Sequence, residues 1–157
     1  GMNPHYQRFF RMVAEGRYFH VGYGTLRKSY GYVGNVAYQY TKLLQVDNED
    51  VHGKTFYLAD YDPLSLRDWA DVLSRELGSP HIKTIPEGVA RVVAICGDLV
   101  NACGFRGFPF NSFRLRNVLM EYRVDLKDLE QLCGSLPYTM DQGVKETVRW
   151  YQASMRG

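Results

Sequence analysis

Apolar side chains recur at helical spacing along most of this chain, and that recurrence constrains the fold more than any other feature. The clearest case is residues 65–78, where Ser65 and Asp68 have the spacing of a capping box and Gly78 has the position of a C-terminal stop. The apolar residues between them share one helical face: Leu66, Trp69, Ala70, Leu73 and Leu77. We therefore predict an amphipathic helix here.

The same reasoning predicts more helices and only a few short strands. The predicted helices lie at residues 5–15, 35–46, 87–102 and 112–120, within 124–134, and in a last segment that a second capping box, Thr139 to Gln142, begins. Asn35 is predicted to be the N-cap of the second of these helices. Alternating patterns predict strands at 17–22 and 54–60. We expect an α/β (α+β) fold that is mostly helical.

Length and charge place limits on the class of protein. The 157 residues suit one domain, 1–157, and leave little room for a dinucleotide-binding domain beside a substrate domain. The near balance of 19 basic and 17 acidic side chains does not call for nucleic acid as a partner. The most apolar segment, from Val89, contains Arg91 and Asp98 and is shorter than a membrane span, so no membrane partner is expected.

The cysteines and histidines favour a reduced protein without a metal. Cys96, Cys103 and Cys133 form an odd set without C-x-x-C spacing, which predicts buried, packed thiols in a cytoplasmic protein. The histidines are scattered, without a second ligand at helix or loop spacing, so no metal site is predicted. Gly1 before Met2 has the form of a residue left by cloning.

Tyr38 and Lys42 stand in the pattern Y-x-x-x-K, which short-chain dehydrogenases use for catalysis. On a helix of 100° per residue this pair lies opposite the apolar positions, which are Val36, Ala37, Tyr40, Leu43 and Leu44. No glycine-rich phosphate loop precedes the pair in this chain. We therefore interpret Tyr38 and Lys42 as a solvent-facing pair and predict no catalytic residue.

Three stretches together resemble a known family. They are the run from Gly16 through RYFHVGYGTLRKSYGYVGNVAYQYTKLLQV, the segment GKTFYLADYDPLSLRDWADVLSRELG, and LPYTMDQGVKETVRWY with Gly143, Thr147, Trp150 and Tyr151. In order, they are similar to the C-terminal substrate-binding part of the NAD-dependent epimerase/dehydratase family, the extended short-chain dehydrogenases. The resemblance covers nearly the whole chain.

The resemblance implies that this chain is a fragment whose N-terminal Rossmann half is missing. NAD or NADP would then bind the full-length parent, and this chain would hold no cofactor and have no activity alone. Its role would be to hold a small-molecule substrate, often a nucleotide sugar, against the cofactor. Removal of the partner domain would uncover an apolar surface that self-association could cover, so a homo-oligomer is possible.

The resemblance also implies site residues. Lys28 falls where nucleotide-sugar members place an arginine, Tyr30 where an aromatic stands beside it, and Arg114 or Arg116 where a second arginine reaches the diphosphate. Phe19 to Val21 match the strand that flanks the base. The basic side chains support the same role on chemical grounds, because guanidinium groups bind diphosphate oxygens through paired hydrogen bonds, and the candidates gather in two places: Arg27 and Lys28, then Arg106, Arg114 and Arg116.

Two departures keep the substrate open. Many family members carry Asp after the Tyr-Val pair, whereas this chain has Gly34 and Asn35, a pattern that also resembles the sterol-dehydrogenase branch. Lysine at Lys28 lacks the planar fork of arginine, which weakens the diphosphate interpretation. The alternatives are a fragment of a sterol-type dehydrogenase and a free-standing, non-catalytic binding or dimerisation module.

Overall fold

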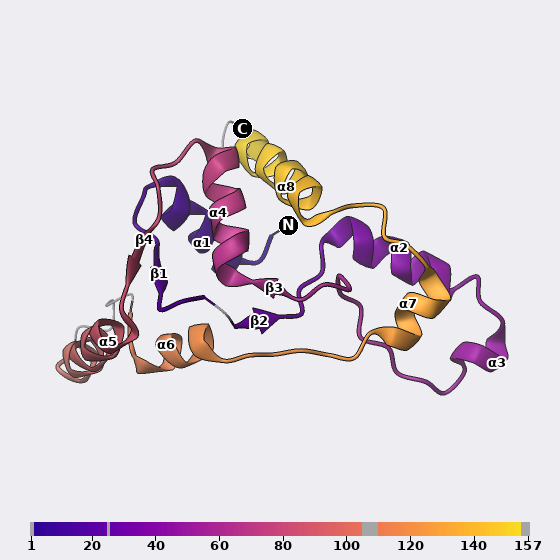
Figure 1. The fold of residues 1–157 in the computed structure, drawn as a ribbon, viewed down its shortest axis with the longest axis horizontal. Coiled ribbons are helices and arrows are strands. Elements are labelled where there is room, and N and C mark those ends of the chain that lie inside the picture. The colour runs from indigo at the N-terminus through magenta and orange to yellow at the C-terminus, as the bar shows by residue number, and fades with distance from the viewer. Residues whose placement is uncertain (1, 25, 105–109, 155–157) are drawn as a thin grey trace.

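The computed structural model describes residues 2–24, 26–104 and 110–154, and helices make up most of them (Figure 1). The helices in chain order are α1 (Pro4–Ala14), α2 (Val33–Leu43), α3 (Asn48–Val51), α4 (Leu66–Leu77), α5 (Glu87–Ala102), α6 (Ser112–Leu119), α7 (Lys127–Cys133) and α8 (Met140–Ser154). The strands are β1 (Phe19–Val21), β2 (Arg27–Lys28), β3 (Leu64–Ser65) and β4 (Lys83–Ile85). The predicted mixed fold with mostly helical content is confirmed.

Two small sheets connect distant parts of the chain. β1 pairs with β4 in parallel, with His20 opposite Thr84. β2 pairs with β3 in antiparallel orientation, with Lys28 opposite Leu64. A single parallel bridge also joins Lys28 to Tyr122, so that the chain after α6 runs beside β2.

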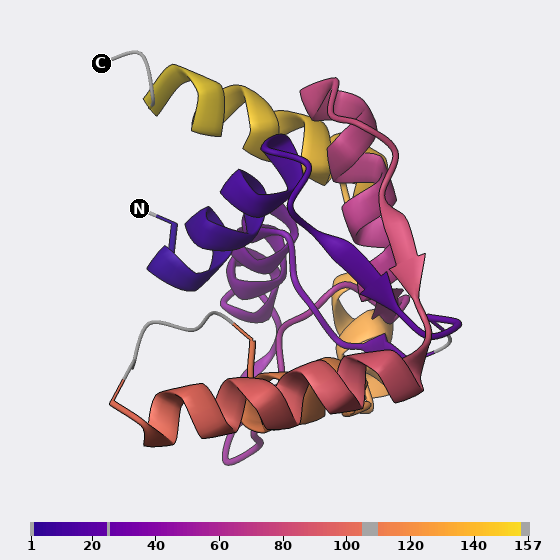
Figure 2. The same ribbon diagram turned by 90° about the vertical axis from the view of Figure 1, so that its left-hand side faces the viewer.

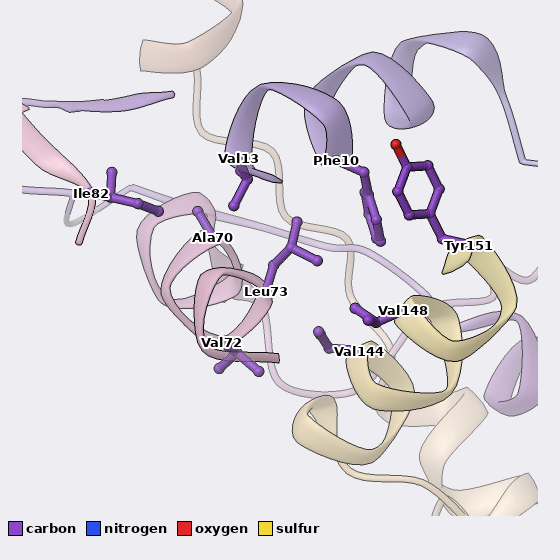
Figure 3. Packing of buried hydrophobic residues seen from close by; sticks show 9 residues of the cluster. All are labelled: Phe10, Val13, Ala70, Val72, Leu73, Ile82, Val144, Val148 and Tyr151. Carbon is purple, nitrogen blue, oxygen red and sulfur yellow. The ribbon is translucent and has the colours of Figure 1, made fainter. Parts of the chain in front are cut away.

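The largest apolar core lies between α1, α4 and α8, and Figure 3 shows Phe10 of α1, Leu73 of α4 and Val148 of α8 directed into the space between these helices. Phe10 of α1 and Leu73 of α4 are 1% and 0% exposed, and Val148 of α8 packs in the same cluster. Rings of α1 surround Trp69 of α4, with Phe9 stacked on it at 4.8 Å between centroids. The amphipathic pattern of residues 65–78 therefore predicted the correct buried face.

Two smaller cores hold the other helices. One joins α2 and α7 around Ala59, Leu129 and Cys133. The other joins α5 and α6 to the first sheet through Ala94 and Leu115. In Figure 1 the α2–α7 group lies to the right of the main core, and α5 and α6 lie at the lower left.

Both predicted capping boxes start helices. The Ser65 hydroxyl accepts a hydrogen bond from the Asp68 backbone N–H at 2.9 Å. At α8 the exchange is reciprocal, because Thr139 Oγ1 accepts from Gln142 N and Gln142 Oε1 accepts from Thr139 N. Gly78 ends α4 with a φ of 65°, as its C-terminal position predicted.

The prediction for the second helix was wrong in its start and in its face. α2 begins at Val33, and Asn35 lies inside it, buried, instead of capping it. The predicted apolar face is largely open to solvent, since Tyr40 and Leu44 are 59% and 72% exposed. The Tyr38 hydroxyl, expected in solvent, donates to the Cys133 carbonyl oxygen at 3.1 Å.

Residues 54–60 do not form the predicted strand. The Gln39 side chain donates to the Ala59 carbonyl oxygen at 2.7 Å, and Asp60 N donates to the Tyr30 carbonyl oxygen at 2.8 Å. These bonds pair the end of the segment with a side chain and a loop in place of a neighbouring strand, so the alternating pattern predicted a strand where the chain has no assigned strand.

The prediction for the cysteines holds for one of them. Cys133 is buried, but Cys96 and Cys103 are exposed, because they lie on the open side of α5 and at its end. Arg106 lies outside the described residues. No helix in the described part of the chain is long and apolar enough to cross a membrane.

The core predicts a clear contrast between two leucines. Leu73→Ala should lower the free energy of unfolding by about 3 kcal/mol, because it leaves a cavity in the main core. Leu44→Ala, at a 72% exposed position, should change it by no more than about 0.5 kcal/mol. Urea denaturation followed by circular dichroism measures both, and equal losses would contradict this view of the core.

Candidate functional site

Lys28 lies where β2 meets the chain around α6. Its ammonium group donates to the Asn117 carbonyl oxygen, and Ser29 N donates to the Tyr122 carbonyl oxygen at 2.8 Å. Burial lowers the pKa of Lys28, because it disfavours the charged form. The Lys28 ammonium group is therefore bonded to the backbone of the residue that follows Arg116 in α6.

Phe19 and Val21 of β1 also face this region. The Phe19 ring meets the Phe110 ring edge-on at 5.6 Å between centroids. Val21 packs on the small core that contains Ala94 and Leu115. The structure thus brings β1, the end of β2 and α6 together, with both β1 residues in packing roles.

The two predicted arginines of α6 diverge. Leu115 between them is buried, and both guanidinium-bearing residues are exposed. Arg116 lines a cavity of about 500 Å³ between α5 and α6, whereas Arg114 does not. The cavity is lined by Arg91, Ile95, Ser112, Leu115, Arg116, Leu119 and Met120. It therefore combines cationic groups with apolar walls.

Within this cavity the two guanidinium groups differ in charge compensation. Arg91 Nε donates to Glu87 Oε1 at 3.0 Å, an ion pair on one helix surface. No ion pair joins Arg116 to another of the described residues. Arg116 is thus the cation of the cavity that remains available to an anionic ligand.

Tyr30 lies at a different cavity from Arg116. Its ring is 5.6 Å from the Trp69 ring, and burial raises the pKa of its hydroxyl. This second cavity has a volume of about 670 Å³, within the usual range for ligand sites. Six of its sixteen lining residues are aromatic: Tyr6, Phe10, Tyr30, Tyr32, Trp69 and Trp150.

Asp60 is a lining residue of the aromatic cavity that sequence reasoning missed. Its carboxylate accepts from Asn35 Nδ2 at 2.8 Å and from the Tyr32 backbone N–H at 3.2 Å. Burial raises the pKa of Asp60, and the two hydrogen bonds oppose that rise because they favour the charged form. The sequence signal that could have pointed to Asp60 is its place as an acidic residue at the end of the extended segment 54–60.

Two glycines border the Tyr32 ring at the same cavity, Gly143 of α8 and Gly34 of α2. A Cβ on Gly143 would come within 2.8 Å of the Tyr32 ring, and one on Gly34 within 2.6 Å of it. Thr147 Oγ1 donates to the Gly143 carbonyl oxygen, while Trp150 is 45% exposed at the cavity. Glycine at these two positions leaves room for Tyr32.

Tyr38 and Lys42 make contacts within the chain. The Tyr38 hydroxyl is engaged with the Cys133 carbonyl oxygen, and Lys42 Nζ lies 5.5 Å from the centroid of the Tyr38 ring. Neither residue lines either of the two cavities. Among the described residues no group of His, Cys, Asp and Glu side chains has an arrangement that could hold a metal ion.

Comparison with known proteins shows the fold but no family. No family model matches the chain. The uncharacterized protein y4nL of Sinorhizobium fredii (strain NBRC 101917 / NGR234) is 33% identical over 89 residues, which are 57% of this chain and 24% of that protein. The crystal structure of gox2253 is similar over 98% of this chain and 45% of its own, with a TM-score of 0.63 and 16% identity. This chain thus spans less than half the length of both proteins.

The hydrogen bonds of Asp60 predict a shift in its titration. Asn35→Ala removes a donor to the charged carboxylate, so the pKa of Asp60 should rise further. The variant should also be less stable by about 3 kcal/mol, because Tyr138 loses its partners in the same side chain. Carboxyl NMR titration and urea denaturation measure the two effects.

The sign of the pH dependence follows from the raised folded-state pKa. The stability contribution of Asp60 is present below its unfolded-state pKa and is lost as pH rises through the folded-state value, and Asn35→Ala enlarges that loss. Asn117→Ala, at an exposed position of α6, is the control and should leave the titration of Asp60 unchanged. A lower pKa of Asp60 in Asn35→Ala would contradict the role of Asn35 as a hydrogen-bond donor that favours the charged carboxylate.

Proposed function

We propose that this chain is the substrate-binding part of an NAD(P)-dependent enzyme of the epimerase/dehydratase type, with a nucleoside diphosphate sugar as the substrate. The observation that carries the proposal is the cavity between α5 and α6, where Arg116, which has no ion pair with another described residue, adjoins apolar walls. Lys28 does not line this cavity, but its ammonium group donates to a backbone carbonyl of the same helix, that of Asn117. A diphosphate bound in the cavity would gain charge-assisted hydrogen bonds from Arg116, and we propose that Lys28 reaches the same ligand from outside the cavity.

A second feature supports the idea of a missing cofactor-binding half. The aromatic cavity continues onto an exposed apolar row of α2, since Val33 lines the cavity and is 73% exposed. Ala37, Tyr40 and Leu44 follow it at helical spacing on the exposed side. Contiguous apolar surface of this kind marks a contact with another domain or protein. We assign this surface to the partner domain and the catalytic chemistry to that domain.

The role of this part is then to orient the substrate and exclude water. Cofactor chemistry would be supplied by the other domain, and this chain fixes the distance between a bound substrate and the cofactor. The fold likeness to less than half of gox2253 is compatible with a part of a longer protein. A sterol-type parent is the second candidate, and the apolar side chains Ile95, Leu119 and Met120 of the same cavity favour it.

The proposed diphosphate site predicts which side chains control the affinity for a nucleotide sugar. By isothermal titration calorimetry, Arg116→Ala should weaken binding of a UDP- or GDP-sugar about 10- to 100-fold, because a charge-assisted hydrogen bond is lost. Lys28→Ala should have a smaller effect, since its ammonium already donates to a backbone carbonyl. Arg149→Ala, on α8 and paired with Glu146, is the control and should bind as the unaltered chain does.

The outcomes of this titration separate the candidates. Equal affinities of Arg116→Ala and Arg149→Ala would remove Arg116 from the site. Binding of a sterol with no binding of nucleotide sugars would favour the sterol-type parent. The titration applies equally to the intact parent protein, where the affinity should be higher because the second domain also contacts the substrate.

The isolated chain should not bind the cofactor. We expect no change in NADH fluorescence on addition of this chain, because neither described cavity has a glycine turn that could hold the pyrophosphate beside Tyr38. A saturable change in fluorescence would contradict the assignment of the cofactor to the partner domain. The integrity of the chain in this assay is checked by its circular dichroism spectrum.

A further inference from the structure

α5 exposes its large aliphatic side chains to solvent and packs its small residues against the rest of the chain. Ala90 and Ala94 are 0% exposed and contact the core that holds Leu115 of α6. The exposed aliphatic residues of α5 are Val89 (50%), Val92 (62%), Val93 (37%), Ile95 (57%), Leu99 (63%) and Val100 (36%), and Cys96 and Cys103 are also exposed. We call this set the outer face of α5. Figure 2 shows α5 lying across the front of the molecule with no other element over it.

Several residues of the outer face are spaced seven positions apart. Val89, Cys96 and Cys103 form one row, and the other two rows are Val92 with Leu99 and Val93 with Val100. At 100° per residue these rows and Ile95 form one continuous apolar arc without a charged side chain. A seven-residue apolar repeat is the pattern that packs one helix against another in a left-handed pair. The outer face therefore has the spacing of a helix-pairing surface.

We propose that the outer face of α5 binds the same face of a second copy of this chain, with the two helices antiparallel and Cys96 facing Cys96 across a twofold axis. Apart from Ile95, the positions of the outer face are arranged symmetrically about that centre. Val92 then faces Val100 of the second copy, and Val93 faces Leu99. Val89 faces Cys103 at the two ends. A twofold pair uses the same patch on both copies, which an arc of this symmetry permits.

Electrostatics and size both favour this occupant. An uncharged arc gives a charged partner no complementary group, whereas it matches itself, and antiparallel helices align their dipoles favourably. A Val, Leu or Ile side chain has roughly 60–120 Å² of apolar area, so the outer face exposes on the order of 400 Å² per copy. Two copies would bury on the order of 800 Å², which is below the roughly 1,200 Å² of a stable interface, so the proposed dimer is weak and reversible.

The first test measures the oligomeric state. Sedimentation velocity of the chain from about 1 to 500 µM should show a monomer–dimer equilibrium in the micromolar range. Leu99→Glu should shift it at least tenfold toward monomer, because it places a charge in the arc. Tyr57→Glu introduces the same charge at a similarly exposed position, in the extended segment 54–60, and should leave the equilibrium unchanged. A monomer at every concentration, or a dimer that only Tyr57→Glu disrupts, would overturn the proposal.

The second test fixes the orientation. With Cys96→Ser and Val89→Cys together, oxidation by copper phenanthroline should link residue 89 of one copy to Cys103 of the other, as peptide mass spectrometry can show. With Cys96→Ser alone, no link through Cys103 should form, because antiparallel pairing separates the two Cys103 thiols by the length of the helix. A Cys103–Cys103 link would indicate parallel pairing and overturn the proposal.

The third test addresses a membrane surface as the rival occupant. The outer face could also contact lipid, so the chain is mixed with vesicles of phosphatidylcholine alone and with added phosphatidylserine. Co-sedimentation with vesicles that Leu99→Glu abolishes, together with a monomer in solution, would overturn the proposal. A dimer that stays in the supernatant supports it.

Discussion

The buried amide of Asn35 is the interaction on which the arrangement around α2 depends. Its Nδ2 group donates to Asp60 Oδ1 and to the Tyr138 carbonyl oxygen, and its Oδ1 accepts from Tyr138 N. One side chain thus joins α2 to two segments distant in sequence. Because each of these polar groups would be costly to bury without a partner, the network admits one arrangement. That arrangement places Asp60 and Tyr32 at the aromatic cavity.

The buried face of a helix could be predicted from the sequence where the helix buries its apolar residues. It could not be predicted where the helix buries polar residues. Apolar spacing and the caps at Ser65 and Thr139 located α4 and α8, because these helices bury apolar residues in the main core. α2 instead buries Asn35 and Gln39, so hydrophobic periodicity selected its opposite face. Segment 54–60 shows the same limit, since alternation cannot say whether a partner strand is present.

α2 and α5 share this inversion, and it connects the fold to function. Both helices bury polar or small residues inside the chain and leave apolar rows exposed. In a monomer, exposed apolar rows lower the solubility and add no stability. The simplest explanation is that each row contacts another domain or protein. Their different chemistry suggests different occupants: the row on α2 continues into an aromatic cavity, whereas the row on α5 is aliphatic and symmetric.

The candidate site was found from sequence only in part, because basic residues are visible in a sequence and cavities are not. Arg116 and Lys28 were predicted from the sequence, and Arg116 lines a cavity whereas Lys28 bonds to the backbone of α6. Tyr30 lies at the other cavity, and Arg91 was not singled out. The Cα atoms of Lys28 and Tyr30 are nonetheless separated by at most about 7 Å, the span of two extended residues. A ligand held by Lys28 could therefore reach Tyr30 and the aromatic cavity. The end of β2 is then the place where a bound substrate would pass from the basic region toward the surface that we assign to the partner domain.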